Sequence, residues 1–409
     1  MPNRLKMEDT HSMNAIPETS GTEASALEAS NTATPPDHRK SAKFAAANIS
    51  PFAGARITKG FAGGREILRS SECRQAGGAA ARLVIDNPDH VSFFFLDGDE
   101  HRKRRASVAG YFTPKAIITR YHPIINETMD ELISDMLSSG TGVLDEMALV
   151  VAAKVTAEIL GLEYGDDPLG MARRLHSIRR TTDKTEGDRL RDEFYDLHIA
   201  PAIEIRRNAP KDDVISYMTR ENYSKPAMMM ECSTYGTAGV STTREFIGMT
   251  AWHLFDRPEL KQQFLNANEE GQFAILQEIL RLDPVTGFLY RRAEVDIPDA
   301  KEGPIKAGDV MAIDIRSANL DPETVGECPV SFDADRAAKT RNMPSYLSFG
   351  DGPHRCPGSQ VALHETRMFL DRLMRVPGIR LEKEPVMQWA NNTQSYEIRE
   401  AVVACDKIG

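Results

Sequence analysis

Apolar residues recur every three or four positions along most of the chain from about residue 44 onward. The stretches 118–137 and 144–162 show this period clearly, and it is the period of a helix that buries one face. Alternation of apolar and polar residues, which is typical of strands, is limited to short stretches such as 308–315 and 395–405. The pattern predicts a mainly α fold with minor β structure, in which a single large helical domain carries a small sheet region.

Composition divides the chain into a tail and a body. Residues 1–43 contain no Phe, Tyr, Trp or Val, so this segment cannot bury enough apolar surface to fold alone. After it, no repeat period and no low-complexity linker interrupts the sequence. We predict a disordered N-terminal tail over 1–43 and one folded domain over 44–409.

The charge balance argues against a nucleic-acid partner. Lys and Arg number 50 against 60 Asp and Glu, for a formal net charge of -10 at pH 7, and no basic block dominates. The strongest apolar run, 147–153, is far too short for a membrane span and ends at Lys154. The five cysteines include no CxxC pair, which favours a reducing compartment over a disulfide framework. We expect a cytoplasmic protein that binds neither membrane nor nucleic acid.

One segment, 226–260, is apolar nearly all round, as is typical of a helix at the centre of a large protein. Gly236 and Gly239 weaken this helix, and the hydroxyl of Thr242 can bond the carbonyl of Ala238, which bends helices. We therefore expect a local distortion near Gly239. Taken alone, such residues are more often packing accommodations than catalysts.

Two charged motifs are ordinary by themselves. Glu278 and Arg281 stand three residues apart on one helical face, a spacing that usually marks a solvated surface pair. His101 and Arg105 stand four apart, with basic residues at 102–104 between them. Considered in isolation, this second motif is only a basic helix.

The stretch SFGDGPHRCPG, 348–358, places one cysteine among three glycines and two prolines just before a predicted helix. Glycines let the backbone turn sharply or approach something flat, and prolines stiffen the same residues. Such a loop is suited to holding Cys356 in place. The alternative is a buried free thiol in a tight turn.

Taken in order, these elements resemble the cytochrome P450 family of heme-thiolate monooxygenases, over roughly 45–405. The family signature is Phe, two residues, Gly, three residues, Cys, one residue, Gly. Phe349, Gly352, Cys356 and Gly358 fill every fixed position of it.

Further matches follow in the family's order. Glu278 and Arg281 match the Glu-x-x-Arg pair, and Arg336 matches the arginine that completes this internal network. The run 317–323 resembles the family's Ala-Asn-x-Asp-Pro run, and 209–216 resembles its loop before the central helix. The resemblance implies that the charged pair organises the core and is not catalytic.

The resemblance implies heme b (iron protoporphyrin IX) as the cofactor, with Cys356 as the axial thiolate and metal ligand. A thiolate ligand pushes electron density onto iron and favours cleavage of the O–O bond. Backbone N–H groups in the glycine turns are expected to point at the sulfur and tune it. The heme propionates need cationic or donor partners. Of two adjacent arginines, Arg291 ranks above Arg292 for this role. The cofactor-binding residues carried over are Cys356, His101, Arg105, Arg291, His354, Phe349 and Gly358.

In the central helix the family places an acid and a threonine after Ala-Gly-x, where they serve dioxygen activation. Here Ser241 and Thr242 stand at these two positions, so a serine replaces the acid. We take both as catalytic candidates, Thr242 assisting proton delivery and Ser241 shaping the groove. Protons would then arrive through ordered water, a polar group of the substrate, or Glu245.

The resemblance also locates a substrate pocket, for which an apolar lining is typical. A segment matching the family's mobile lid, 171–194, carries several arginines that would favour an anionic substrate or simply form solvated helix faces. The predicted substrate-binding residues are Phe94, Tyr235, Ala238, Gly239, Val285 and Phe288.

These residues together imply a monooxygenase that inserts one oxygen atom from O2 into a small or medium-sized apolar substrate, by hydroxylation or oxidative demethylation. The sequence has no flavin, nicotinamide or iron–sulfur fingerprint, so a separate ferredoxin and ferredoxin reductase are expected to supply electrons. Residues 102–104 and Arg355 form a candidate basic docking patch or a solvated helix. The alternatives are a peroxide-driven enzyme and a non-catalytic heme-binding protein, but the retained Thr242 and the displaced Arg244 favour the monooxygenase.

Overall fold

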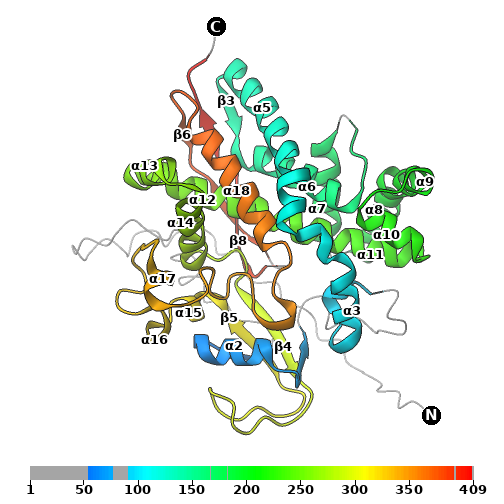
Figure 1. Ribbon diagram of the computed structural model, residues 1–409, viewed down its shortest axis with the longest axis vertical. Coiled ribbons are helices and arrows are strands. Elements are labelled where there is room, and N and C mark those ends of the chain that lie inside the picture. Colours follow the sequence, from blue (N-terminus) through cyan, green and yellow to red (C-terminus); the bar gives the residue numbers. More distant parts are fainter. Residues whose placement is uncertain (1–53, 77–90, 166, 182, 391–392, 408–409) are drawn as a thin grey trace. The chain divides into compact units, whose positions relative to one another are not determined.

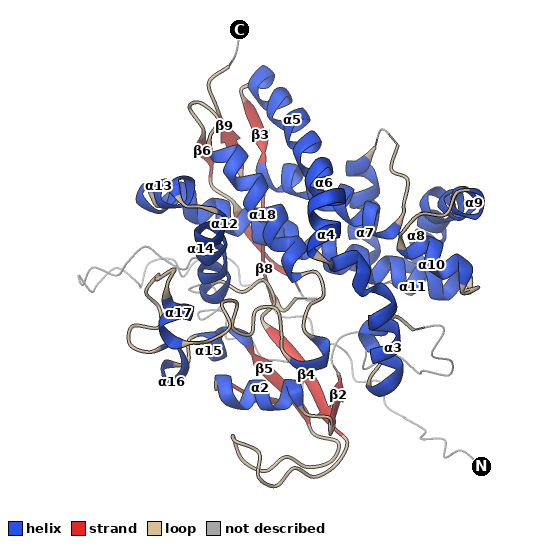
Figure 2. Ribbon diagram, viewed as in Figure 1, coloured by secondary structure: helices blue, strands red, loops and turns tan. Residues whose placement is uncertain are grey.

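The computed structural model describes residues 54–76, 91–165, 167–181, 183–390 and 393–407, without the side chains of residues 179 and 180. All of them belong to one compact unit that spans residues 38–409. The predicted tail, 1–43, lies outside the described residues. Helices dominate and the strands are short (Figures 1 and 2), so the predicted mainly α fold with minor sheet is confirmed.

The helices vary in length from single turns to elements of about five turns. None in the described part of the chain is long and apolar enough to cross a membrane. Their bounds are α2 Phe61–Arg69, α3 Gly98–Val108, α4 Pro114–Ala116, α5 His122–Ser139, α6 Leu144–Leu160, α7 Pro168–Arg180, α8 Lys184–Phe194, α9 Ala200–Asn208, α10 Val214–Arg220, α11 Lys225–Tyr235, α12 Thr242–Asp256, α13 Pro258–Asn266, α14 Glu269–Leu282, α15 Ile315–Asn319, α16 Pro322–Val325, α17 Arg336–Thr340 and α18 Ser359–Met374.

The strands form three small sheets, ordered β1-β5-β4-β2, β3-β9-β6 and β7-β8. Only the β1–β5 pairing is parallel among those described. The first sheet packs against α2 through a shared apolar cluster. Strand bounds are β1 Arg56–Thr58, β2 Cys73–Gln75, β3 Thr141–Val143, β4 Phe288–Ala293, β5 Val310–Asp314, β6 Arg380–Lys383, β7 Val386–Ala390, β8 Ser395–Arg399 and β9 Val402–Ala404.

The predicted elements appear with small differences. The helix expected over 144–162 is α6, and it ends where Gly161 adopts a left-handed conformation. The alternation over 395–405 is divided between two strands, β8 and β9, because Glu400 between them has a φ of +60°. A positive φ turns the chain out of one sheet and into another.

A continuous helical run, α11 to α12, passes through the core, as the all-round apolar pattern predicts. Every residue from Thr243 to Leu254 is buried, and α12 packs against both α6 and α18. This placement leaves no solvated face for α12. Helix α12 is therefore held firmly on all sides, directly after residues 236–241.

The Glu278–Arg281 pair lies in the core, as the family resemblance implies, and not on the surface, where this spacing is usually found. Arg281 is 0% exposed and donates to both carboxylate oxygens of Glu278 at 2.7 Å. Arg336 also donates to Glu278, at 3.1 Å. A buried charge is tolerated only when it is paired and hydrogen-bonded, and this network meets that condition.

The same network leads to the cysteine loop. Arg281 donates to the backbone carbonyl of Asn319 at 3.1 Å, and the amide oxygen of Asn319 accepts from the N–H of Leu347 at 2.9 Å. Ser348 donates to the carbonyl of Leu280 at 2.8 Å. Leu347 and Ser348, at the start of the loop, are thus linked to the end of α14.

Candidate active site

Cys356 lies in a tight loop just before α18. Gly350 and Gly352 both have a φ of +68°, a conformation that residues with a Cβ rarely adopt. A Cβ on Gly352 would also lie 2.5 Å from the carbonyl oxygen of Leu68. The N–H of Cys356 donates to the carbonyl oxygen of Phe349 at 2.9 Å, which closes the turn around the cysteine.

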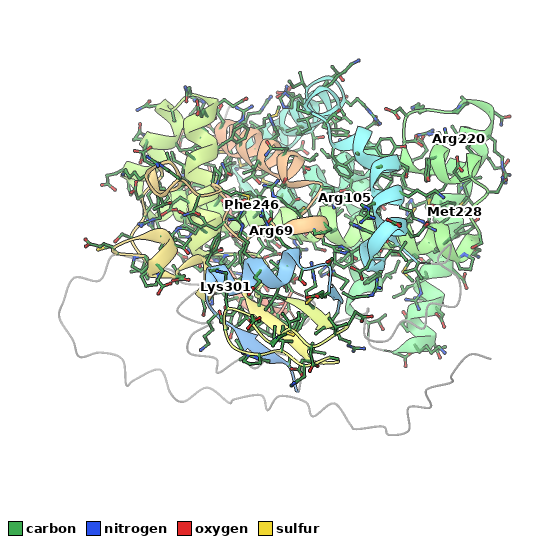
Figure 3. The ribbon with its side chains drawn as sticks, turned by 60° about the horizontal axis from the view of Figure 1, so that its bottom comes forward. Arg69, Arg105, Arg220, Met228, Phe246 and Lys301 are labelled. Carbon is green, nitrogen blue, oxygen red and sulfur yellow. The ribbon has the colours of Figure 1, made fainter. Side chains whose placement is uncertain are left out.

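Asp351 fastens this loop to α2. Its carboxylate is buried and accepts hydrogen bonds from Arg65 at 2.7 Å and Arg69 at 2.9 Å. It also accepts from the N–H of Gly352 at 2.7 Å. The loop therefore keeps its shape through contacts with a helix that is nearly 300 residues earlier in the chain, where Figure 3 marks Arg69.

Three neighbouring groups favour the charged form of the Cys356 sulfur. Burial raises the pKa of the Cys356 thiol, while the N–H of Gly358 and the charges of Arg105 and Arg355 oppose that rise. Each of these groups stabilises a thiolate over a thiol. Figure 3 marks Arg105 on α3. A donor set of this kind suits a sulfur that binds a metal.

The two predicted histidines meet. The rings of His101 and His354 stack with centroids 4.1 Å apart and planes 29° apart. Burial, followed by the charges of His354 and Arg105, lowers the pKa of His101 to about 4. The Nε2 atom of His354 lies 3.0 Å from a carboxylate oxygen of Asp97.

The structure distinguishes Arg291 from Arg292. Both are in β4, where alternate side chains face opposite sides of the sheet, and Arg291 is buried whereas Arg292 is exposed. Arg291 donates to the carbonyl of Tyr290 at 2.8 Å and to the side-chain oxygen of Gln75. Burial lowers the pKa of Arg291 to about 10.

These groups fit a cofactor that carries two carboxylates. Among the described residues, neither Arg105 nor Arg291 has a carboxylate within ion-pair distance, and Arg105 donates to the carbonyl of Arg355. The buried Nε2 of His101 and Nε of Arg355 have no hydrogen-bond partner in the same part of the chain. Buried donors without partners are costly, and the propionates of heme would satisfy them.

The central helix distorts where expected. Gly236–Ser241 forms a turn of π-helix between α11 and α12, a feature often found at functional sites. The hydroxyl of Thr242 donates to the carbonyl of Ala238 at 2.5 Å. Ala238 is exposed although Val240 is buried, so one side of this turn borders open space.

Neither Gly239 nor Ser241 is exposed at that opening. A Cβ on Gly239 would lie 2.5 Å from the hydroxyl oxygen of Thr156 on α6, so packing between helices requires glycine here. This orientation does not support the predicted substrate contact of Gly239. Ser241 is buried and Thr242 is partly exposed.

Phe93, and not Phe94, faces the interior. Phe93 is 7% exposed and Phe94 is 42% exposed, because the 92–95 segment turns Phe94 outward against Phe95. Phe93 packs edge-on against Tyr235 with centroids 6.1 Å apart. Phe94 therefore stays a prediction, and Phe93 is the residue of this segment that contacts Tyr235.

Tyr235 is buried between the rings of Phe93 and Phe112. Its hydroxyl has no hydrogen-bond partner among the described residues. A cavity of about 10 Å³ lies beside Tyr235 and Glu231, roughly the space of one water molecule. Tyr235 thus contributes an aromatic ring with one polar atom to this part of the core.

The last two predicted substrate residues belong to different clusters. Val285 is buried in the main core. Phe288 is buried in a small cluster with Tyr290 and Ala312 on the first sheet. The structure does not place these two side chains together.

The arginines of the predicted lid whose side chains the structure describes are paired. Arg173 bonds Glu146, Arg189 lies between Glu186 and Glu193, and Arg191 bonds Asp188 at 2.6 Å. Arg174 lies 3.6 Å from Asp167. These pairs favour solvated helix faces over recognition of an anionic substrate.

The basic residues of α3 do not share one face. Arg102 is exposed and pairs with Asp99. Arg104 is buried, bonds Glu100 at 3.1 Å and lies 4.0 Å from Glu231. Arg104 is therefore removed from the proposed docking patch.

Glu245 is not available as a proton carrier. Its carboxylate accepts from Arg244 at 3.0 Å, from Arg399 at 2.5 Å and from the N–H of Ile398 at 2.9 Å. Two of these contacts, with Ile398 and Arg399, are with β8. Glu245 joins the end of the chain to the central helix.

Three functional carboxylates were missed by the sequence analysis, namely Asp97, Glu231 and Asp351. Asp97 stands just before a predicted helix, where an acidic residue is most often a helix cap. Its position therefore indicated no role beyond capping. Glu231 is one of many residues in an apolar helix. Asp351 lies inside the quoted loop, but nothing local indicates that its partners are on α2.

Comparison with known proteins agrees with this geometry. Residues 273–380, which include the Glu278–Arg281 pair and the cysteine loop, match the family model described as Cytochrome P450. The chain is 27% identical over 318 residues to "Cytochrome P450(MEG)" of Priestia megaterium, covering 72% of this chain and 75% of the relative. It is 27% identical over 307 residues to "Mycinamicin IV hydroxylase/epoxidase" of Micromonospora griseorubida, covering 72% and 75%.

A solved structure shares the fold. The cytochrome P450 MoxA from Nonomuraea recticatena superposes with a TM-score of 0.71 at 25% sequence identity, over 86% of this chain and 90% of that one. In this chain α18, which follows the cysteine loop, packs against α12, which follows the π turn. The matched segment, the relatives and the shared fold support a bacterial-type cytochrome P450, which is a heme-thiolate monooxygenase.

Proposed function

We propose that this protein inserts one oxygen atom from O2 into a small or medium-sized apolar substrate, by hydroxylation or oxidative demethylation, with Cys356 as the axial ligand of heme b. The observation that carries the proposal is the half-buried Cys356, whose thiolate form is favoured by the N–H of Gly358 and by the charges of Arg105 and Arg355. When bound, heme supplies the iron at which dioxygen is activated, and the thiolate makes that iron electron-rich.

The cysteine loop holds the sulfur in place and keeps it charged. The hydrogen bond from the N–H of Gly358 stabilises the thiolate, and such bonds tune the donor strength of a metal ligand. The turn closed by Phe349 fixes the backbone of Cys356. The loop thus holds the cysteine backbone in a fixed turn and favours its thiolate form.

We assign the propionates to His101, Arg105, Arg291 and His354. Arg105 and Arg291 supply positive charge from a helix and a strand. Burial lowers the pKa of both guanidinium groups. Neutral His101 contributes a ring nitrogen donor. Charge-assisted hydrogen bonds to a carboxylate are roughly twice as strong as neutral ones.

Thr242 is the residue we assign to proton delivery. Its hydroxyl now bonds the carbonyl of Ala238 at the exposed side of the π turn, from which it can rotate toward a proton donor. Because Glu245 is fully engaged with β8, protons are expected to come through ordered water or a polar group of the substrate. Ser241 shapes the groove beside it.

An apolar substrate suits the walls of the site. Phe93, Tyr235 and Ala238 supply aromatic and small apolar surface, and the hydroxyl of Tyr235 offers a single polar contact. Pockets of this composition are typical of small-molecule sites. The relative named as a hydroxylase/epoxidase supports oxygen insertion as the reaction.

The electrons are expected from a ferredoxin and its reductase. The exposed Arg102 and Lys103 on α3 would interact with an acidic partner, since electrostatic complementarity mainly speeds encounter. Peroxide use is less favoured, because Arg244 is buried against Glu245 and Glu397. In that position Arg244 cannot grip a substrate carboxylate.

The test is the absorption spectrum of dithionite-reduced protein with carbon monoxide, for wild type, Cys356→Ser and Cys328→Ser. Cys328 is an exposed free cysteine and serves as the matched control. We expect a strongly red-shifted Soret band that only Cys356→Ser abolishes. A band unchanged in Cys356→Ser would contradict thiolate ligation by this residue.

Turnover then separates the two routes. A panel of small apolar substrates is screened with ferredoxin, reductase and NADPH, and in parallel with hydrogen peroxide alone. Product that requires the electron-transfer system and O2 supports the proposal. Product of the same yield with peroxide alone would assign the protein to the peroxide-driven class.

A further inference from the structure

Asp97 joins three parts of the chain that surround the predicted propionate site. It stands at the start of α3, yet its side chain makes no capping bond to that helix. One carboxylate oxygen lies 3.0 Å from Nε2 of His354 in the cysteine loop. The other accepts the backbone N–H of Gln75 in β2 at 3.0 Å.

The first contact determines how His354 is oriented. The ring of His354 is held on one edge by Asp97 and on one face by His101. With Nε2 directed at the carboxylate, only Nδ1 remains to meet another ligand. The side chain of His354 is 7% exposed, so little freedom is left to the ring.

The second contact extends the effect to Arg291. Asp97 holds the backbone of Gln75, and the side-chain oxygen of Gln75 accepts a hydrogen bond from Arg291. Strands β2 and β4 also pair Gln75 with Arg291 in register. One carboxylate is therefore connected to two of the assigned propionate partners, on two different elements.

We propose that Asp97 is a positioning residue for the cofactor, which holds His354 directly and Arg291 through Gln75 in the orientations that receive the propionates. This inference rests on the proposed assignment of these two residues to heme. Asp97 itself does not contact the propionates, because two carboxylates repel each other. Partners that orient ligands in this way typically contribute about 10- to 100-fold to metal affinity.

The experiment measures the rate of heme loss from the ferric holoprotein to excess apomyoglobin. The variants are Asp97→Ala, which removes both contacts, and Asp97→Asn, which keeps an acceptor oxygen but no charge. Asp99→Ala is the matched control, because Asp99 is exposed two residues further on and pairs only with Arg102 among the described residues. We expect about tenfold faster loss or more for Asp97→Ala, a smaller increase for Asp97→Asn, and the wild-type rate for Asp99→Ala.

A double-mutant cycle with His354→Ala separates positioning from a general loss of structure. If Asp97 acts through His354, its substitution accelerates heme loss less in the His354→Ala background than in wild type. Fully additive effects would overturn the proposal, since independent sites add. If Asp97→Ala fails to fold, the same cycle is run with Asp97→Asn.

The outcomes also separate this inference from the proposed function. A wild-type protein that takes up no heme, or keeps its red-shifted band in Cys356→Ser, would overturn both. A protein with a normal thiolate spectrum whose Asp97 variants lose heme at the wild-type rate would overturn only the role of Asp97.

Discussion

Glu231 on α11 accepts a hydrogen bond from the hydroxyl of Ser92 at 2.9 Å and another from the backbone N–H of Phe93 at 3.2 Å. The guanidinium of Arg104 lies 4.0 Å away. These contacts attach the segment before α3 to the helix that enters the active site. They hold the ring of Phe93 against Tyr235, and so shape the wall that a substrate would meet.

Loss of this carboxyl should destabilise the protein. Glu231→Ala leaves the buried hydroxyl of Ser92 and the N–H of Phe93 without an acceptor, at a cost of about 3 kcal/mol. Glu231→Gln keeps one acceptor oxygen and should cost less. Urea unfolding of the three proteins checks this order, and equal midpoints would contradict a structural role for the attachment.

The same residue predicts a pH dependence. Burial raises the pKa of Glu231 above its ordinary value of 4.5, so the folded state binds this proton more tightly than the unfolded state. The contribution is fully present below pH 4.5 and is lost as pH rises through the folded pKa. The stability of wild type relative to Glu231→Gln should therefore fall with rising pH above 4.5. Thermal unfolding at several pH values measures this difference, and a rise instead would show that the carboxylate form is favoured by Arg104.

Breaking the buried charge network should have a large effect. Arg281→Ala leaves Glu278 buried with fewer donors, and removal of one partner of a buried pair costs about 3–5 kcal/mol. Arg207 and Glu204 have the same i,i+3 spacing on the surface, so Arg207→Ala is the control, with an expected change under about 1 kcal/mol. Chemical denaturation compares the two. Similar losses in both variants would show that burial does not set the cost.

Arg291 and Arg292 offer a matched pair for the cofactor. Arg291→Ala should lower heme occupancy in purified protein, because it removes a buried cation from the assigned propionate site. Arg292→Ala should leave occupancy unchanged, since this side chain is exposed. The ratio of Soret to protein absorbance gives the result. Full occupancy in Arg291→Ala would remove this residue from the cofactor site.

Thr242→Ala should uncouple oxygen consumption from product formation, with the excess oxygen appearing as peroxide. Thr242→Ser, which keeps a hydroxyl, should remain coupled. Thr128→Ala is a control for the packing effect, because Thr128 makes the same bond to the carbonyl four residues earlier, in α5. Oxygen uptake, peroxide and product are measured together once a substrate is known. Unchanged coupling in Thr242→Ala would exclude the hydroxyl from proton delivery.

Short-range patterns in the sequence were reliable guides. The period of apolar residues predicted the C-terminal end of α6 to within two residues. Gly239 and Thr242 predicted a distortion of the central helix. The structure has a π turn there, and the hydroxyl of Thr242 bonds the carbonyl of Ala238. The spacing of Phe349 and Cys356 identified the loop. In each case the residues that determine the feature lie within a few positions of one another.

The sequence by itself thus determined the helical class, the family and the loop that carries the cysteine, because local period, turn residues and spacing encode them. Tertiary structure alone decided that Phe93 and not Phe94 points inward, that Arg104 is buried, and that Glu245 is committed to β8. It also brought Asp97 to His354 across 257 residues of sequence. Such contacts depend on how whole elements pack, and no pattern within one element records which distant side chain it will meet.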